Sequence, residues 1–187
     1  MGRIIVSEFV SLDGVMEAPG GEPGYKHTGW VAKFQDEQQI KFKLEEVLAV
    51  EALLLGRKTY EGFSEAWPFV SGKFGDKMNS LPKFIASTTL KNVSWNNSKI
   101  LGPDTLSEVK KIKNDFQGDV MVNGSRTLVN FLKLNHLVDE YRLMIFPIVL
   151  GSGMRLFDEV NDFEMLKLVD SHPFKNGAII LTYQPTI

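Results

Sequence analysis

Two segments of this chain share one order of features: an apolar strand, a glycine, and then the start of a helix. They are residues 52–61, ALLLGRKTYE, and residues 119–128, DVMVNGSRTL. After each glycine the sequence places cations and hydroxyls where the helix begins. Because a helix N-terminus offers unpaired N–H groups and the positive end of the helix dipole, both turns suit phosphate. Two such turns in one small protein indicate a ligand whose phosphates are spread along it, and a dinucleotide fits better than a mononucleotide.

Composition narrows the class of protein. The chain has 187 residues, 43% of them hydrophobic and 24% charged, with a formal net charge of −2. This size and balance predict one domain over residues 1–187 with a single core. The slight negative charge gives no reason to expect a nucleic-acid partner, which a basic stripe would indicate. The absence of cysteine excludes disulfides, thiolate metal sites and cysteine nucleophiles. With no signal-peptide pattern and no apolar stretch long enough for a membrane span, we expect a soluble cytoplasmic protein with no membrane partner.

The apolar pattern predicts that strands and helices alternate along the first half of the chain. The first strand, Arg3–Ser11, is apolar on both faces, which is typical of a central strand. Residues 12–29 are rich in glycine and proline, and a loop this long directly after a core strand indicates a lid. Residues 30–50 have helical spacing, and a short helix after the first glycine turn ends before Pro68. Residues 69–82 are expected to be a connection.

The second half of the chain is richer in strands. Residues 138–150 have a strand pattern but contain Pro147, which fits an edge or a bulge better than a central position. The other expected elements are strands at 83–87 and near Ile100, a helix at 106–116, and an antiparallel pair at 163–170 and 178–183. We therefore expect an α/β fold with a central mixed sheet flanked by helices, mostly parallel, with an antiparallel C-terminal edge.

Three motifs occur in an order found in one superfamily: SLDG at residues 11–14, LLGRKTYE at residues 54–61 and PIVLGSG at residues 147–153. With them, essentially the whole chain resembles the dihydrofolate reductase-like proteins, and within these the branch of the reductase domain of bifunctional riboflavin biosynthesis enzymes. The resemblance implies a three-layer dihydrofolate reductase-like fold, NADPH as the hydride donor, a small-molecule substrate and often a homodimer. The strand-rich C-terminus offers an edge at which such a dimer can form.

Two features depart from this family pattern. The riboflavin enzymes usually carry a fused zinc deaminase domain, and this chain has no cysteine for one. Dihydrofolate reductase has a substrate-gripping acid on the helix after the lid, where this chain offers Asp36 and Glu37 in a different surrounding sequence. The resemblance therefore indicates the cofactor more strongly than the substrate.

The first glycine turn supplies candidate phosphate ligands. Arg57 and Lys58 follow Gly56 and are placed to hold a 2′-phosphate or the pyrophosphate, with Thr59 donating its hydroxyl. The alternative is a tight strand exit followed by a solvated cation, because a glycine turn alone is a weak motif. No acidic residue is placed for a ribose 2′-hydroxyl, which favours NADPH over NADH.

Further cofactor candidates follow two later strands. Ser87 and Thr88, at the end of strand 83–87, can offer hydroxyls to the adenosine-side phosphate or simply form a turn. Ser125 is a natural helix N-cap, and the functional interpretation is pyrophosphate contact through the backbone N–H groups of the second turn. The candidates of the second turn are Asn123, Gly124, Ser125, Arg126 and Thr127.

Candidate catalytic and substrate-binding residues lie near the lid and the first helices. The fold implied by the resemblance starts the lid at the nicotinamide edge, so Asp13 is the expected catalytic acid, orienting the substrate or a proton-donating water. An Asp-Gly turn is the alternative. Asp36 is a candidate substrate-binding acid or a helix-dipole partner. Trp30 and Trp67 can wall the substrate pocket by stacking, although large aromatic residues more often belong to the core. The three histidines stand apart in the sequence, so no metal site is expected.

These observations predict an NADPH-dependent reductase of a small heterocyclic, pteridine-like or pyrimidine-like, or carbonyl substrate. Two alternatives stay open. One is a stand-alone riboflavin-pathway reductase acting on a ribosylaminopyrimidine phosphate, with Lys26 or Arg155 at the substrate phosphate. The other is a non-catalytic, dimeric nucleotide-binding protein that kept the fold without the reaction.

Overall fold

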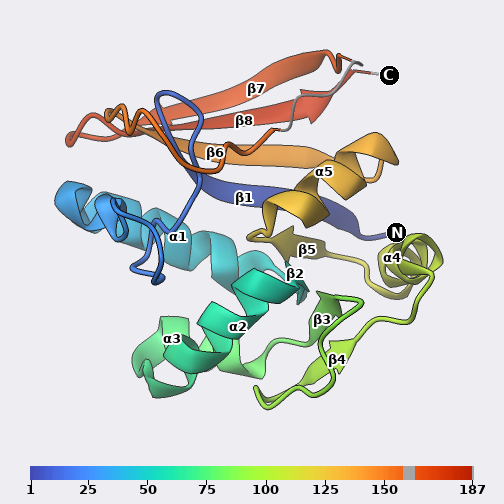
Figure 1. Ribbon diagram of the computed structural model, residues 1–187. Coiled ribbons are helices and arrows are strands. Elements are labelled where there is room, and N and C mark those ends of the chain that lie inside the picture. Colours follow the sequence, from blue (N-terminus) through green and yellow to red (C-terminus); the bar gives the residue numbers. More distant parts are fainter. Residues whose placement is uncertain (158–162, 187) are drawn as a thin grey trace.

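The protein is built around one mixed sheet, in a computed structural model that describes residues 1–157 and 163–186. The strands of these residues lie in the order β4-β3-β2-β5-β1-β6-β8-β7 (Figure 1). They are β1 (Arg3–Ser11), β2 (Ala52–Gly56), β3 (Lys83–Ala86), β4 (Ser98–Ile100), β5 (Asp119–Val122), β6 (Glu140–Phe146), β7 (Leu166–Pro173) and β8 (Ile179–Pro185). From β4 to β6 every neighbouring pair is parallel, and β8 runs antiparallel to both β6 and β7. The predicted mixed sheet with an antiparallel C-terminal edge is confirmed.

Helices make all but one of the crossovers between parallel strands; β3 and β4 are joined by residues 87–97, which form no helix. The helices are η1 (Trp30–Phe34), α1 (Glu37–Ala49), α2 (Arg57–Ala66), η2 (Trp67–Phe69), α3 (Gly72–Ser80), α4 (Thr105–Asp115) and α5 (Arg126–Leu134). In the described part of the chain, none of them has both the length and the apolar character needed to cross a bilayer.

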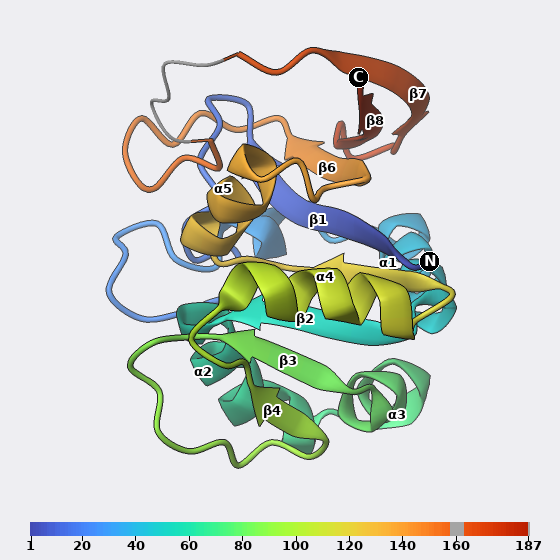
Figure 2. The same ribbon diagram turned by 90° about the vertical axis from the view of Figure 1, so that its right-hand side faces the viewer.

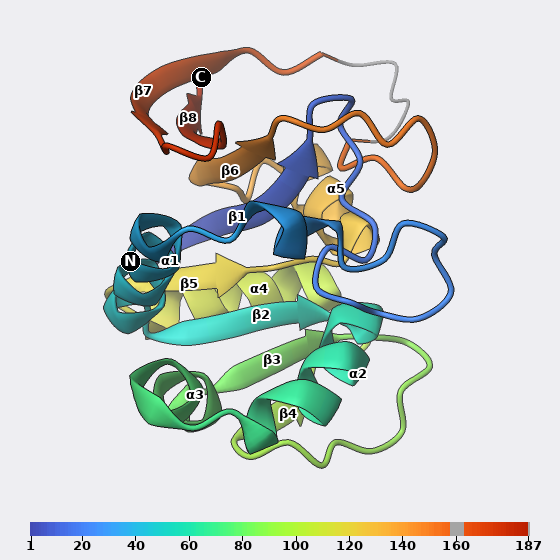
Figure 3. The same ribbon diagram turned by 90° about the vertical axis from the view of Figure 1, so that its left-hand side faces the viewer.

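The helices cover both faces of the parallel part of the sheet. α1, α2 and α3 lie on one face and α4 and α5 on the other, as Figures 2 and 3 show from opposite sides. Successive residues of β2 explain both layers, because side chains of a strand alternate between its faces. Leu55 shares an apolar cluster with Val47 of α1, whereas Leu54 shares one with Val109 of α4 and Val129 of α5. Burial on both faces produces the three-layer fold that the apolar strands predict.

The position of β6 differs from the sequence expectation. The pattern of residues 138–150 predicts a strand interrupted by Pro147 at an edge or a bulge. Instead, β6 ends at Phe146 and lies between β1 and β8, inside the sheet. Since proline has no N–H to donate, Pro147 ends the ladder and leaves the preceding residues unbroken. The edge assignment is therefore wrong, and β4 and β7 form the two edges.

Residues 69–82 also differ, because most of this expected connection is the helix α3. Its Gly75 allows a close approach to the chain before it: a Cβ there would lie 1.9 Å from the carbonyl oxygen of Val70. Met78, on the same helix, is buried in the core. Gly75 thus allows close packing between α3 and the segment that leads into it.

The lid, residues 12–29, is joined to the loop that follows β6. Val15 forms an isolated antiparallel bridge with Arg155, and the Met16 N–H donates to the Met154 carbonyl over 2.9 Å. The indole N–H of Trp30 donates to the Glu17 carbonyl over 2.9 Å. These bonds bring the chain after β1 and the chain after β6 together at one end of the sheet.

Lys83 joins three segments at the other end of β3. Its side chain is fully buried, and its ammonium donates to the carbonyls of Leu81 at 2.8 Å, Asn96 at 3.0 Å and Asn79 at 3.1 Å. The same ammonium lies 4.2 Å from the centre of the Trp95 ring. Buried backbone carbonyls need hydrogen-bond donors, and the Lys83 ammonium supplies them at the end of α3 and before β4.

We expect Lys83→Met to lower the free energy of unfolding by about 2–4 kcal/mol, because it leaves buried carbonyls without donors. Urea unfolding at pH 7 measures this value. Lys73→Met, on the exposed surface of α3, is the control and is expected to change stability by less than about 0.5 kcal/mol. Equal stabilities of the two variants would contradict this role of Lys83.

Candidate active site

The carboxyl ends of the parallel strands define the candidate site. β1, β2, β3, β5 and β6 run in one direction, so their carboxyl ends meet at one edge of the sheet. Ligands of open parallel sheets bind at this edge. Most candidate residues from the sequence directly follow one of these strand ends, which places them along the same edge.

The two glycine turns touch each other through their backbones. The Gly56 N–H donates to the Gly124 carbonyl over 3.0 Å. A Cβ at Gly56 would lie 2.2 Å from the Ser125 hydroxyl oxygen and 2.7 Å from the Ser125 nitrogen. Gly124 itself has φ +92°, a backbone conformation that favours glycine. The starts of α2 and α5 therefore lie side by side.

Among the described residues, no side chain caps the start of α2 or of α5. The N-cap of α2 is Gly56, and Ser125 is the N-cap of α5 by position but accepts no capping bond. The starts of α1 and α4 are different, since Asp36 and Asp104 accept hydrogen bonds from backbone N–H groups there. Two adjacent helix starts without side-chain caps present N–H donors and positive dipole ends to one region, which suits an anion.

Cations and a hydroxyl surround these starts. Arg57 forms an ion pair with Glu61 over 2.9 Å, and both side chains are about two-fifths exposed, at 41% and 44%. Lys58 is exposed. The Thr59 hydroxyl faces the second turn, lying 2.7 Å from the position that a Gly124 Cβ would occupy. The first turn thus offers its cations to solvent and its hydroxyl to the neighbouring turn.

The other cofactor candidates either form hydrogen bonds within the fold or are exposed to solvent. The Ser87 hydroxyl accepts from the N–H groups of Thr89 at 3.2 Å and Leu90 at 2.9 Å, so it forms a turn, and Thr88 is exposed. The Asn123 amide donates to the Ser7 carbonyl over 2.8 Å and ties the end of β5 to β1. Thr127 is exposed in the first turn of α5, which begins at Arg126.

Asp13 joins the lid to the loop after β6. Its carboxylate accepts from the Ser11 hydroxyl at 2.7 Å and from the backbone N–H groups of Leu150 at 3.0 Å and Gly151 at 2.8 Å. These bonds, led by the one from Ser11, lower the pKa of Asp13 to about 2. The carboxyl is therefore ionised at neutral pH and holds no proton to give.

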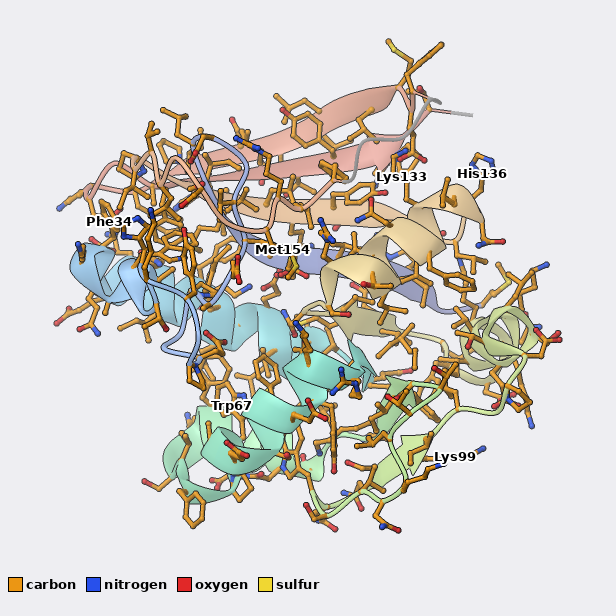
Figure 4. The ribbon with its side chains drawn as sticks, in the orientation of Figure 1. Phe34, Trp67, Lys99, Lys133, His136 and Met154 are labelled. Carbon is orange, nitrogen blue, oxygen red and sulfur yellow. The ribbon has the colours of Figure 1, made fainter. Side chains whose placement is uncertain are left out.

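The candidate substrate residues do not converge. Asp36 caps α1 by accepting from the N–H groups of Gln38 and Gln39. Trp67 packs against Phe74 with ring centres 5.0 Å apart, and Figure 4 places it beside α2, away from the labelled Met154 of the loop after β6.

Trp30 is buried, yet it also lines a hollow of about 340 Å³ between the lid and the loop after β6. Lys26, Lys33 and Leu150 share this lining. Of the three substrate candidates, Trp30 therefore lines the hollow between the lid and the loop after β6.

Glu8 is a residue of this region that the sequence analysis missed. It is 7% exposed, and its Oε1 has no hydrogen-bond partner among the described residues. Oε1 lies 3.7 Å from the position of a Gly124 Cβ. Burial raises the pKa of Glu8 to about 8, an effect that the charge of Lys43 opposes. The available signal was a single acid within the apolar run of the first strand, since unpaired glutamates are rarely buried.

Comparisons with known proteins agree with this architecture. The profile of the RibD C-terminal domain family matches residues 3–180, and the chain belongs to this family. The uncharacterized protein YyaP of Bacillus subtilis (strain 168) is 29% identical over 187 residues, which cover 97% of this chain and 94% of YyaP.

Two solved structures show the same fold. A protein of Shewanella sp. PV-4, provisionally assigned to riboflavin biosynthesis, aligns with a TM-score of 0.76 and 23% identity over 99% of each chain. Dihydrofolate reductase from Enterococcus faecalis, complexed with NADP(H), aligns with a TM-score of 0.60 and 14% identity over 99% of this chain and 97% of its own. The predicted dihydrofolate reductase-like fold and the resemblance to the riboflavin reductase branch are confirmed, and together they support a reductase-type function.

We expect Gly56→Ala to lower the free energy of unfolding by about 1–3 kcal/mol, because its Cβ would overlap Ser125 and push α2 and α5 apart. Gly62→Ala, in the interior of α2, is the matched control. A Cβ there meets only Glu22 at an ordinary 3.7 Å, so stability is expected to rise by up to about 1 kcal/mol. Urea unfolding of both variants provides the test. A Gly56→Ala variant with an unchanged free energy of unfolding would contradict the close contact between the two turns.

Proposed function

We propose that this protein is an NADPH-dependent reductase of a small heterocyclic or carbonyl substrate. The observation that carries the proposal is the contact between the two glycine turns, which sets the uncapped starts of α2 and α5 side by side. A dinucleotide has phosphates that can use both starts at once. Membership of the RibD C-terminal domain family supports the same reaction class.

The chain offers residues that fit each part of this cofactor. The backbone N–H groups of 57–59 and 125–127 would hold the pyrophosphate, and the Thr59 hydroxyl would add a donor. Arg57 and Lys58 would take the 2′-phosphate, because they reach into solvent beside the first turn. Ser87 and Thr88 would border the adenosine side. Bound NADPH supplies the hydride, and the protein binds, orients and excludes water.

In this proposal the substrate lies under the lid, and Asp13 is a positioning residue. Its ionised carboxylate holds the loop after β6 against the start of the lid, which shapes the reacting end of the site. The hollow lined by Trp30 lies between the same two segments. Trp67 and Asp36 would support the site indirectly by stabilising the fold, since Trp67 packs against Phe74 and Asp36 caps α1.

The riboflavin-pathway alternative has one specific observation in its favour. Lys26 and Lys33 line the Trp30 hollow, and two cations there would suit a phosphate on the substrate. A ribosylaminopyrimidine phosphate carries such a group. Comparing turnover of phosphorylated and unphosphorylated pyrimidines with that of pteridines and simple carbonyls distinguishes this alternative. Tight NADPH binding without turnover of any of them would favour the non-catalytic protein.

We further propose a homodimer that acts in the cytoplasm. The edge strand β7 is exposed along most of its length and carries the apolar Leu168 and Val169 at 49% and 42% exposure. An exposed edge of this kind is a ready surface for pairing with a second copy.

The first experiment is a titration with NADPH and NADH that follows the fluorescence of Trp30, Trp67 and Trp95. We expect NADPH to bind more tightly than NADH. Arg57→Ala should weaken NADPH binding about tenfold and leave NADH nearly unchanged, because it removes a charge-assisted bond to the 2′-phosphate. Glu61→Gln is the matched control: it removes the ion-pair partner of Arg57 and keeps the cation, so NADPH affinity should hold or rise slightly.

Three results would count against the proposal. They are no binding of either nucleotide, equal affinity for both, or an Arg57→Ala variant that binds NADPH as well as the unsubstituted protein. The first result would contradict the assignment of a nicotinamide cofactor. The other two would contradict only the assignment of the 2′-phosphate to the first glycine turn.

A further inference from the structure

The end of β5 leaves Glu8 beside the second glycine turn. β1 and β5 pair through Val6 and Val122, after which β5 passes into the turn. Glu8 is two residues beyond Val6, so its side chain emerges on the same face of β1. That face carries apolar Ile4, Val6 and Val10, which pack under α4 and α5. Glu8 is the acidic member of an otherwise apolar row, at the point where the row reaches the site.

Four segments of the chain meet at this point. The position of a Gly124 Cβ lies 3.7 Å from the Glu8 Oε1, 2.7 Å from the Thr59 hydroxyl oxygen and 3.6 Å from the Met16 methyl carbon. These groups come from β1, α2 and the lid, and Gly124 itself precedes α5. A carboxyl and a hydroxyl thus lie within a few ångströms of both uncapped helix starts.

Keeping a carboxyl here costs stability. Buried polar atoms are nearly always hydrogen-bonded, and Oε1 of Glu8 has no partner among the described residues. An apolar side chain would suit the neighbouring Val6 and Val10 better. Residues that oppose stability in this way are typical of functional sites.

The charged groups near Glu8 decide, together with its burial, whether its carboxyl is protonated. Lys43 of α1 lowers its pKa, although that ammonium is already bonded to Ser7 and Glu46. The lid and α2 present Met16 and Thr59, which carry no charge, and the strand neighbour on β6 is Leu143. The second turn presents Gly124 and Ser125, and α5 begins with the cation Arg126. Desolvation outweighs the charge of Lys43 and raises the pKa of Glu8 to about 8, so Glu8 stays protonated at neutral pH.

We propose that Glu8 is a ligand-contacting residue whose protonated carboxyl donates a hydrogen bond to an oxygen of the phosphate-bearing ligand held at the starts of α2 and α5. This inference rests on the proposed function, because it assigns one more contact to the same site. An ionised Glu8 would place a negative charge against an anionic ligand. Binding therefore requires the protonated acid, and the ligand in turn holds that proton in place.

The test is the dissociation constant of NADPH between pH 7 and 9.5, a range in which the phosphate groups are already ionised. For the unsubstituted protein we expect little change up to pH 8 and a rise of about tenfold per pH unit above it, since the free protein then loses the proton that binding requires. Glu8→Gln keeps a neutral donor at every pH, so its affinity should match the unsubstituted protein at pH 7 and then stay nearly constant. Glu45→Gln, on an exposed part of α1, should retain the full pH dependence.

A flat profile for the unsubstituted protein, or the same rise in Glu8→Gln, would overturn the inference. The first of these needs no variant, so the test stands even if Glu8→Gln fails to fold. Inorganic pyrophosphate, measured at each pH with both the unsubstituted protein and Glu8→Gln so that its own titration cancels, separates this inference from the proposed function. If pyrophosphate binds in a way that depends on Glu8 while NADPH does not bind, the Glu8 contact is supported and the proposed cofactor is contradicted. If NADPH binds with an affinity that does not depend on Glu8, the proposed cofactor is supported and the Glu8 contact is contradicted. If neither probe binds, both the inference and the proposed function are overturned.

A second readout follows from the same protonation. Above pH 4.5 the unfolded chain loses the Glu8 proton, whereas the folded protein keeps it until about pH 8, so the acid destabilises the fold increasingly across this range. Glu8→Gln should therefore melt at a higher temperature than the unsubstituted protein at pH 7 to 8, with a difference that disappears near pH 4.5. A difference that is independent of pH would show that Glu8 is not a buried protonated acid.

Discussion

The contact between Gly56 and the turn at Gly124 and Ser125 is the constraint on which the site depends. The two turns end strands that are far apart in the chain but neighbours in the sheet. Only a missing Cβ lets their backbones approach closely enough for the Gly56 N–H to reach the Gly124 carbonyl. That approach sets two helix starts together, and their N–H groups and dipoles then act on one region. Without it, the starts of α2 and α5 would lie apart.

Two carboxyls near this edge are in opposite protonation states because their surroundings differ. Asp13 accepts three hydrogen bonds, from the Ser11 hydroxyl and from two backbone N–H groups, and is ionised. Glu8 is buried with an unpartnered oxygen and stays protonated. Hydrogen bonding to the charged form stabilises the first, and loss of water disfavours the charged form of the second. Asp13, the acid of the family motif, therefore joins two loops, while Glu8, the acid that carries a proton, lies on β1.

The elements that the sequence predicted well are those with strong local patterns. The strand Arg3–Ser11 has the expected bounds, and the helices after both glycine turns begin at the expected residues. The errors came from residues with more than one structural use. Residues 69–82 suggest a connection, but Gly75 allows α3 to pack closely there, and Pro147 suggests an interrupted strand but ends one. Sequence alone does not reveal which neighbour a glycine approaches or whether a proline lies inside or just after a ladder.

The sequence by itself determined the mixed sheet, the two phosphate-suited turns and the candidate cations Arg57 and Lys58, because strand and helix periodicity and glycine turns are local properties. The tertiary structure decided that the two turns touch, that Asp36 and Ser87 satisfy backbone groups, and that Glu8 is buried beside Gly124. Burial and hydrogen bonding depend on which segments meet. The state of a carboxyl at this site is therefore a property of the assembled sheet edge and not of the chain around the residue.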